Sequence, residues 1–185
     1  MEQEQISRES FVDTLREKAR KIKLLLLDVD GVLTDGRIIY DSHGRDMKFF
    51  DVHDGLGVYI LSKAGIKTVL ITAKSSRSIP PRARDMRVEE VFANITPKTL
   101  VLDKILKKYR VKIQEVCFVG DDLVDLCLMK RVGFPVAVFN AAPEIKQVAS
   151  YITVRSGGRG AVREVAELIL KSQGKWEEVL RSYGL

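Results

Sequence analysis

The run of four leucines at residues 24–27 constrains the fold of this chain more than any other feature. The run has no polar alternation, and a lysine and an aspartate bound it. A strand that is apolar at every position is expected in a parallel sheet with both faces covered. The run is far shorter than the roughly 20 residues that cross a bilayer. We therefore predict a buried strand here and no membrane span.

Strand-like and helix-like segments alternate along the rest of the chain. An amphipathic helix is expected at about 7–21, with Ser7 or Ser10 as its N-cap. Strands are predicted at 68–72, 91–92, 116–119, 136–139 and 151–153, and helices at 55–63, 76–86, 98–109, 123–130, 143–149 and 161–171. This alternation predicts an α/β fold of three layers, in which helices cover both faces of a parallel sheet.

Two short strand-like runs lie between the first strand and the first of these later helices. Residues 37–40 and 46–50 flank turn-forming residues at 41–44, which predicts a small protruding β-hairpin. With 185 residues and 45% hydrophobic composition, the chain has the size of one domain. We expect a single domain over 1–185, with a hairpin flap at 36–50 and a C-terminal tail at 172–185.

The net charge of +6 favours anionic partners, of which phosphate esters, nucleic acids and acidic membranes are all examples. The basic clusters at 16–23 and 104–112 have no interleaved aromatic residues, which favours solvated helix faces over a nucleic-acid groove. The N-terminus is polar and does not resemble a signal peptide. We expect a soluble cytoplasmic protein that binds neither nucleic acid nor membrane.

Polar side chains follow the predicted strands directly. Asp28 and Asp30 come after the first strand, Thr72 ends the second, and Asp121 follows the strand at 116–119, with Asp122 and Asp125 soon after. Because ligands bind at the carboxyl ends of parallel strands, these side chains are expected to converge. Lys98, at the start of a predicted helix, could add a positive charge.

Such a concentration of carboxylates is costly unless a cation lies among them, and oxygen ligands suit Mg²⁺ better than zinc. A metal ion, a lysine and a hydroxyl together would neutralise and position a phosphoryl group. The sequence thus indicates phosphoryl-transfer chemistry.

The order and spacing of these residues resemble the four motifs of the haloacid dehalogenase superfamily. Residues 28–34 match the first motif, Thr72 the second, Lys98 the third and residues 120–125 the fourth. The resemblance implies that Asp28 is a nucleophile that becomes an aspartyl phosphate. It also implies that Asp30 protonates the leaving oxygen and later deprotonates water.

The same resemblance implies roles for the remaining residues. Asp28, the backbone carbonyl of Asp30, and Asp121 would hold Mg²⁺, while Asp122 and Asp125 would orient this shell or Lys98. Thr72 would hydrogen-bond the phosphoryl oxygens, and Lys98 would balance the charge of the nucleophile and the phosphate.

The motif spacings leave no room for the cap domain that many members of this superfamily carry. Only 41 residues separate Asp30 from Thr72, and 22 separate Lys98 from Asp121. A capless site is open in a monomer. It suits a macromolecular substrate, or an oligomer in which a neighbouring subunit forms the lid.

A closer resemblance extends from residue 22 to about residue 175. The chain is similar to the 3-deoxy-D-manno-octulosonate 8-phosphate (KDO 8-phosphate) phosphatase family, tetrameric enzymes of lipopolysaccharide precursor synthesis. Matching segments include Leu33-Thr34-Asp35-Gly36 and, most specifically, the glycine-rich stretch at 157–164. The resemblance implies a sugar acid phosphate substrate and a homotetramer joined through the hairpin, with a C-terminal tail that can reach a neighbouring site.

Family positions also suggest the substrate pocket. By position, its lining would be Asp30, Asp51, Val52, His53, Asp54, Gly55, Tyr59, Lys74, Arg82 and Lys98. The family generally has Asn and Arg where this chain has Asp51 and His53, and arginines where it has Tyr59 and Lys74. Because lysine lacks the two-point hydrogen bonding of arginine, these departures leave the identity of the sugar open.

Three other functions remain as alternatives. The nearest is a phosphatase acting on a nine-carbon relative, a nonulosonate 9-phosphate. A receiver-like signalling module also uses paired aspartates, a hydroxyl and a lysine, but it places the phosphorylated aspartate after a middle strand, and Asp28 follows the first predicted strand. The basic charge and the open site would also fit a 3′-phosphatase on nucleic acid.

Overall fold

Within residues 12–185, the part of the chain that the computed structural model describes, six strands form one parallel sheet in the order β5-β4-β1-β6-β7-β8. The strands are β1 (Leu24–Leu27), β4 (Lys67–Ile71), β5 (Glu90–Phe92), β6 (Val116–Gly120), β7 (Phe134–Ala137) and β8 (Tyr151–Ile152). The four leucines of β1 are fully buried. They pair in parallel with β4 on one side and β6 on the other, so the strand predicted to be parallel and buried lies in the interior of the sheet.

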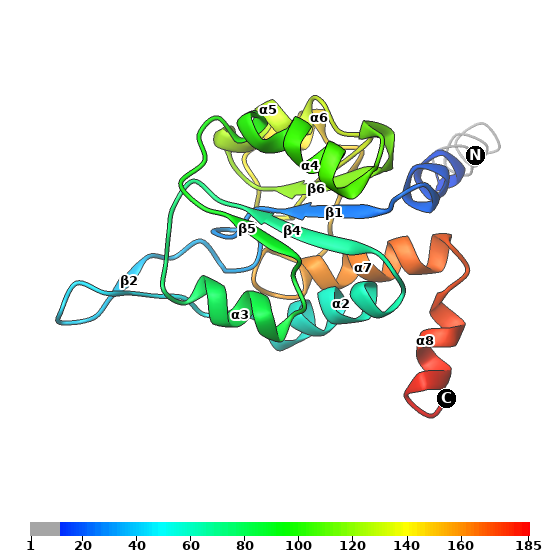
Figure 1. The fold of residues 1–185 in the computed structure, drawn as a ribbon, viewed down its shortest axis with the longest axis horizontal. Coiled ribbons are helices and arrows are strands. Elements are labelled where there is room, and N and C mark those ends of the chain that lie inside the picture. The colour runs from blue at the N-terminus through cyan, green and yellow to red at the C-terminus, as the bar shows by residue number, and fades with distance from the viewer. Residues whose placement is uncertain (1–11) are drawn as a thin grey trace, which may run out of the picture.

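Helices cover both faces of the sheet (Figure 1). On one face lie α4 (Leu102–Tyr109), α5 (Leu126–Met129) and α6 (Pro143–Val148), and on the other α2 (Val52–Lys63), α3 (Ile79–Asp85) and α7 (Ala161–Ser172). The prediction of a three-layer α/β fold is therefore confirmed. No helix in residues 12–185 combines the length and apolar composition needed to cross a membrane.

The predicted hairpin is present, and no cap domain interrupts residues 12–185. Strands β2 (Ile39–Tyr40) and β3 (Asp46–Met47) pair antiparallel and project beyond the edge where β1 ends (Figure 1). The interval before Thr72 holds only this hairpin, α2 and β4. The interval after Lys98 holds η1 (Lys98–Val101), α4, η2 (Ile113–Glu115) and β6.

Several predicted boundaries were wrong. Helix α2 begins at Val52 rather than at residue 55, because Asp51 caps it by accepting hydrogen bonds from the backbone N–H groups of His53 and Asp54. Strand β7 occupies 134–137 rather than 136–139. The N–H of Phe139 donates to Thr153 Oγ1 and to the carbonyl of Arg155, so this residue belongs to a loop.

Other differences concern helices. The predicted helix at 98–109 begins as the 3₁₀ turn η1, and the one at 123–130 begins as η3 (Leu123–Asp125). The C-terminal tail contains α8 (Trp176–Ser182), for which no helix was predicted. The first predicted helix is described only over 12–20, so its proposed N-caps lie outside the described residues.

Candidate active site

The loop after β1 forms the centre of the site. Asp28 is the first residue beyond the strand, and its side chain is nearly buried. The chain then turns sharply through Gly31, whose φ of +90° lies in the left-handed region. A Cβ at Gly31 would lie 1.9 Å from Asp121 Oδ2, so only glycine lets this loop approach the fourth motif so closely.

The carboxyl ends of β1 and β6 bring three acidic side chains together. Oxygens of Asp28, Asp121 and Asp125 all lie within 4.8 Å of one another. Burial, followed by repulsion from neighbouring carboxylates, raises the pKa of both Asp28 and Asp121. These ionised groups are therefore unstable together without a further cation.

Lys98 supplies one of the required positive charges. Its ammonium Nζ lies 2.6 Å from Asp28 Oδ1 and 2.5 Å from Asp125 Oδ1, and all three side chains are nearly or fully buried. Burial alone would lower the pKa of Lys98, but the two carboxylates hold it above 10.5. The lysine is thus a fixed cation beside the predicted nucleophile.

Asp125 and Asp122 differ in their surroundings, although the sequence suggested similar roles. Asp125 is fully buried, and its Oδ2 accepts a hydrogen bond of 2.9 Å from the backbone N–H of Asp121. A Cβ at Gly120 would lie 2.7 Å from Asp125, which explains the glycine before the pair. Asp122 is exposed and accepts from the N–H of Leu123 at the start of η3.

The three acidic residues fit a hard divalent cation. The donor atoms are all carboxylate oxygens, which Mg²⁺ prefers to nitrogen or sulfur. Because Asp125 is already occupied by Lys98 and by the Asp121 backbone, Asp28 and Asp121 are the pair left to bind a metal ion. The required proximity of these two residues was the central spatial prediction from the sequence.

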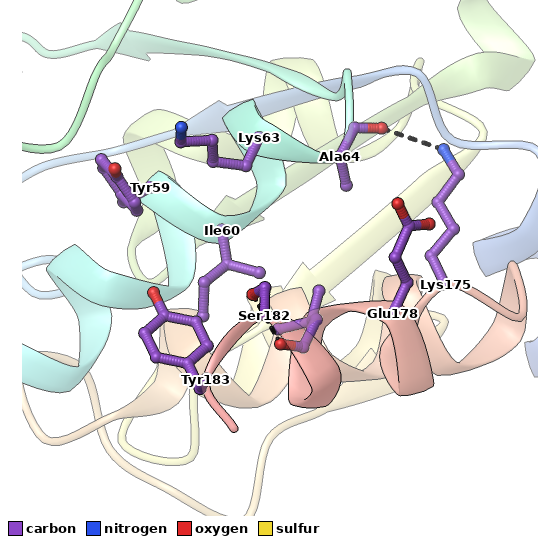
Figure 2. Close-up of a pocket in the computed structure, with 9 residues that line it drawn as sticks. Tyr59, Ile60, Lys63, Ala64, Lys175, Glu178, Ser182 and Tyr183 are labelled. Carbon is purple, nitrogen blue, oxygen red and sulfur yellow. Dashed lines mark hydrogen bonds between the residues drawn. The ribbon is translucent and has the colours of Figure 1, made fainter. Parts of the chain in front are cut away.

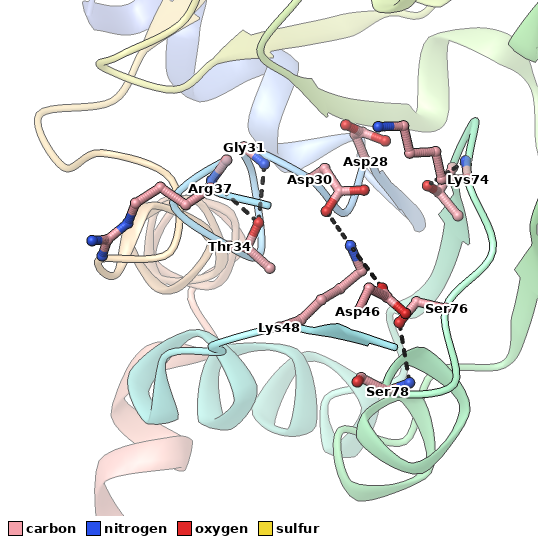
Figure 3. A network of polar contacts seen from close by, with 12 residues as sticks. Asp28, Asp30, Gly31, Thr34, Arg37, Asp46, Lys48, Lys74, Ser76 and Ser78 are labelled. Carbon is pink, nitrogen blue, oxygen red and sulfur yellow. Dashed lines mark hydrogen bonds and ion pairs between the residues drawn. The ribbon is translucent and has the colours of Figure 1, made fainter. Parts of the chain in front are cut away.

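Thr72 follows β4 on the other side of β1. It is buried, and its Oγ1 accepts a hydrogen bond of 3.2 Å from the backbone N–H of Lys74. In the view of Figure 3 the Lys74 side chain extends toward the carboxyl group of Asp28. The loop after β4 therefore brings a hydroxyl and a second lysine to the edge that carries Asp28.

Asp30 faces the hairpin. Lys48, just beyond β3, contacts Asp30 Oδ1 through its Nζ, and Asp46 Oδ2 lies 3.7 Å from the same nitrogen (Figure 3). A groove of about 910 Å³ opens here. It is lined by Asp30, by the hairpin from Ile38 to Lys48, and by residues 74–77 and 80.

Sequence reasoning missed Lys48. Lysines are common on exposed hairpin strands, where they discourage pairing with other chains, so a lysine at this position carries no signal of its own. Only the three-dimensional structure shows that this side chain turns inward, where it is 8% exposed.

Part of the predicted pocket lies at the start of α2. The Asp51 carboxylate caps the helix and lies 3.1 Å from Nδ1 of the exposed His53, while Val52 is 73% exposed. Arg82 Nη2 donates to the carbonyl of Asp51 at 2.7 Å. A Cβ at Gly55 would lie 2.1 Å from that same Nη2, so glycine makes room for the arginine.

The side chains of Asp54 and Tyr59 do not point toward the groove beside Asp30. Asp54 is buried, and its carboxylate accepts hydrogen bonds from the N–H groups of Gly160 and Arg163 at the start of α7. Tyr59 lines a different pocket of about 510 Å³ between α2 and α8, together with Lys63, Tyr183 and neighbouring residues (Figure 2). The structure therefore does not bring these two side chains to the groove beside Asp30.

The glycine-rich stretch at 157–160 packs on the loop that follows Asp28. A Cβ at Gly157 would lie 1.6 Å from the carbonyl oxygen of Gly31, and one at Gly158 would lie 2.4 Å from Thr34. Glu164 holds the approach to this stretch by accepting from the N–H groups of Val154 and Arg155. The glycine-rich stretch, the most specific segment of the family resemblance, thus packs against the loop that carries the first motif.

Comparison with known proteins agrees with this geometry. Residues 88–164, which include Lys98 and the fourth motif, match the haloacid dehalogenase-like hydrolase family. The KDO 8-phosphate phosphatase of Escherichia coli K12 is 38% identical over 161 residues, covering 87% of this chain and 86% of the relative. That of Yersinia pestis is 36% identical over 165 residues, covering 89% and 88%.

Solved structures give the same result. The Moraxella catarrhalis KDO 8-phosphate phosphatase, in complex with magnesium, phosphate and KDO, is 38% identical with a TM-score of 0.90, covering 92% of this chain and 98% of that one. The cobalt-bound phosphatase from Haemophilus influenzae is 34% identical with a TM-score of 0.82, covering 85% and 92%.

The sheet order, the four motifs and the missing cap define a haloacid dehalogenase-like hydrolase. With identities of 36–38% over most of both chains, this protein belongs to the 3-deoxy-D-manno-octulosonate 8-phosphate phosphatase family.

Proposed function

We propose that this protein is a magnesium-dependent phosphatase that hydrolyses 3-deoxy-D-manno-octulosonate 8-phosphate to the free sugar acid and inorganic phosphate. The observation that carries the proposal is the meeting of Asp28, Asp121 and Lys98 at one sheet edge, in a chain of this family. Solved relatives contain magnesium, phosphate and the sugar acid in one case and cobalt in another.

The first half-reaction starts from Asp28. Its Oδ1 contacts Lys98, which leaves Oδ2 to attack phosphorus. As the new oxygen–phosphorus bond forms, the bond to the sugar oxygen breaks, and Asp30 donates a proton to that oxygen. Lys98 and the Thr72 hydroxyl are placed to stabilise the transferred group and to hold Asp28 in position.

In the second half-reaction Asp30 takes a proton from water, and the resulting nucleophile cleaves the aspartyl phosphate. Asp28, Asp121 and the backbone carbonyl of Asp30 are the groups that would hold Mg²⁺. When bound, the ion supplies positive charge for the phosphoryl oxygens.

The groove beside Asp30 supports a small anionic substrate. It is lined by Lys48, Lys74, Arg77 and Arg45, against the carboxylates of Asp30, Asp41 and Asp46. We propose that the sugar acid lies here. Asp51, His53 and Arg82 would border this groove, and Lys74 would contact the phosphoryl group or the adjacent hydroxyls.

We further propose that the whole of 1–185 acts as one domain in a cytoplasmic homotetramer, with the hairpin flap 36–50 and the tail 172–185 at subunit contacts. Four large apolar side chains of the hairpin support this: Ile38, Tyr40, Met47 and Phe49 are 44–65% exposed. Monomeric proteins rarely leave such side chains clustered in water. Light scattering should therefore give the mass of four chains, and a monomer at assay concentration would contradict the proposal.

The function is tested by measuring phosphate release from KDO 8-phosphate with and without Mg²⁺. We expect release that depends on magnesium, is stopped by EDTA and is abolished in Asp28→Asn. The exposed neighbour Asp122→Asn serves as the matched control and should retain activity. Full activity of Asp28→Asn would refute the mechanism.

The same assay should include a nine-carbon 2-keto-3-deoxynonulosonate 9-phosphate, because Lys74, which lines the groove beside Asp30, replaces a family arginine. Faster turnover of the nine-carbon substrate would move the assignment to that sugar while leaving the chemistry unchanged.

A further inference from the structure

The hairpin does more than project from the molecule, because it delivers Lys48 into the site of its own chain. The Lys48 side chain is 8% exposed, whereas the side chains of the ion-paired hairpin arginines Arg37 and Arg45 are 68% and 64% exposed. Its Nζ contacts Asp30 Oδ1 and has Asp46 as a second neighbour at 3.7 Å. A buried ammonium group is costly unless it is paired, so this geometry constrains both partners.

Within residues 12–185, the carboxyl group of Asp30 is contacted by the ammonium group of Lys48. The carboxyl group is 27% exposed and would otherwise be free to rotate in the open groove. The contact engages Oδ1 and leaves Oδ2 without a protein partner within the described part of the chain. A proton donor must be held in one orientation to act efficiently, because misplacement by about 1 Å can cost about 100-fold in rate.

We propose that Lys48 is a positioning residue for the reaction: by holding Oδ1 of Asp30, it turns Oδ2 toward the leaving oxygen of the substrate. This inference rests on the proposed function of Asp30. During the first step the proton passes from Asp30 to the sugar oxygen as the bond from phosphorus to that oxygen breaks. The carboxylate that remains is next to the Lys48 cation, which stabilises the charge as it forms.

The leaving group separates this role from a merely structural one. The alkoxide of an alkyl or sugar phosphate needs a proton in order to leave, whereas p-nitrophenolate leaves without one. A variant with a misplaced Asp30 is therefore slow with alkyl phosphates only. A variant with a damaged fold, metal site or nucleophile is slow with both.

The experiment measures leaving-group release in the first turnover by rapid mixing, so that hydrolysis of the aspartyl phosphate does not limit the rate. The substrates are KDO 8-phosphate, glycerol 3-phosphate and p-nitrophenyl phosphate, of which the last two lack a carboxylate. The variants are Lys48→Met, Lys48→Arg and Asp30→Asn. Lys108→Met, which removes an ion-paired lysine at the far end of α4, is the matched control.

In Lys48→Met we expect the first-turnover rate to fall by about 10- to 100-fold with both alkyl phosphates, because misplacing a catalytic group by about 1 Å can cost about 100-fold. With p-nitrophenyl phosphate it should change by less than about threefold, because no proton transfer is needed. Lys48→Arg should recover most of the loss, and Lys108→Met should resemble the unmodified protein.

Equal loss with all substrates in Lys48→Met, at an unchanged melting temperature, would overturn the positioning role. So would a change in KM alone, which would make Lys48 a binding residue. Asp30→Asn distinguishes a failure of the proposed acid role of Asp30 from a failure of the inference about Lys48. If it shows no selective loss with alkyl phosphates, the proposed acid role of Asp30 fails; if it does and Lys48→Met does not, only the inference about Lys48 fails.

Discussion

Replacing Asp125 by asparagine tests the electrostatic account of the site most sharply. The substitution hardly changes the shape of the side chain but removes a buried charge. The carboxylate of Asp125 uses both oxygens: Oδ1 contacts Lys98 Nζ at 2.5 Å and Oδ2 accepts from the N–H of Asp121 at 2.9 Å. Asparagine has a single acceptor oxygen, so one of these two donors would face an NH₂ group.

The expected change in the free energy of unfolding follows from two opposing effects. Losing a hydrogen bond to a charged group, with its donor left buried, costs about 1.5–3 kcal/mol. Removing one of three clustered carboxylates relieves repulsion, and Lys98 keeps its contact with Asp28. We therefore expect the free energy of unfolding to fall by about 2 kcal/mol, which lowers the melting temperature by about 4–8 °C for a chain of this size.

Activity should suffer more than stability does. Because Asp125 orients both Lys98 and the Asp121 backbone, we expect kcat to fall by about 10- to 100-fold. Asp122→Asn, only three residues away, should change the free energy of unfolding by less than about 0.5 kcal/mol, since its side chain is exposed and asparagine is also a good N-cap. Urea unfolding and phosphate release measure both effects.

Equal losses of activity or stability in Asp125→Asn and Asp122→Asn would refute the reasoning. If Asp122→Asn lost as much activity or stability as Asp125→Asn, the division between a buried orienting carboxylate and an exposed capping one would be wrong. An Asp125→Asn variant with unchanged kcat would show that Lys98 does not need this partner.

Three further predictions follow from the same contacts. Mg²⁺ at about 100 times its dissociation constant should stabilise the protein by about 2.7 kcal/mol in thermal unfolding, and Asp121→Asn should remove this effect. Gly157→Ala should lower the free energy of unfolding, measured in urea, by about 3 kcal/mol or more, because the new Cβ would collide with the carbonyl of Gly31. Gly44→Ala should lower it by only about 1–2 kcal/mol through backbone strain, because the space around Gly44 is open. Burial raises the pKa of Asp54 from 3.8 to about 6, so the folded state binds this proton more tightly than the unfolded state, and the resulting stabilisation is lost as the pH rises from about 4 to about 6. The free energy of unfolding of the unmodified protein, relative to that of Asp54→Asn, should therefore fall by about 1–2 kcal/mol between pH 5 and 7.5. A difference that does not depend on pH would contradict this.

The sequence was most informative where burial dictates residue type. A strand buried on both faces must be apolar throughout, so β1 was visible in its four leucines, and the parallel sheet followed from the alternation of strands and helices. Because all parallel strands end at one edge, Asp28 and Asp121 could be placed together without knowing any distance. The glycines at 31 and 120 mark close approach to Asp121 and Asp125.

The residues that could not be placed are those whose direction depends on tertiary packing. Lys48 follows a short hairpin strand, and no periodicity shows that it turns back toward Asp30. Asp54 lies three residues after Asp51 on the sequence, yet it turns to cap α7. Tyr59 faces the pocket beside α8, a helix that the sequence pattern did not reveal. Positions carried over from family resemblance identify a residue but not the direction of its side chain.

The distribution of charge around Asp28 separates the duties of its cations. Lys98 is buried between Asp28 and Asp125, so its charge stays beside these two carboxylates. Within residues 12–185 no lysine or arginine pairs with Asp121, and its raised pKa reflects the burial and repulsion that a metal ion would relieve. Lys48 and Lys74 lie on the groove side, where charge changes during each turnover. A chain with these residues therefore gives up stability at the sheet edge, where Asp28 and Asp121 would hold a metal ion, while Lys48 and Lys74 would act on the substrate side.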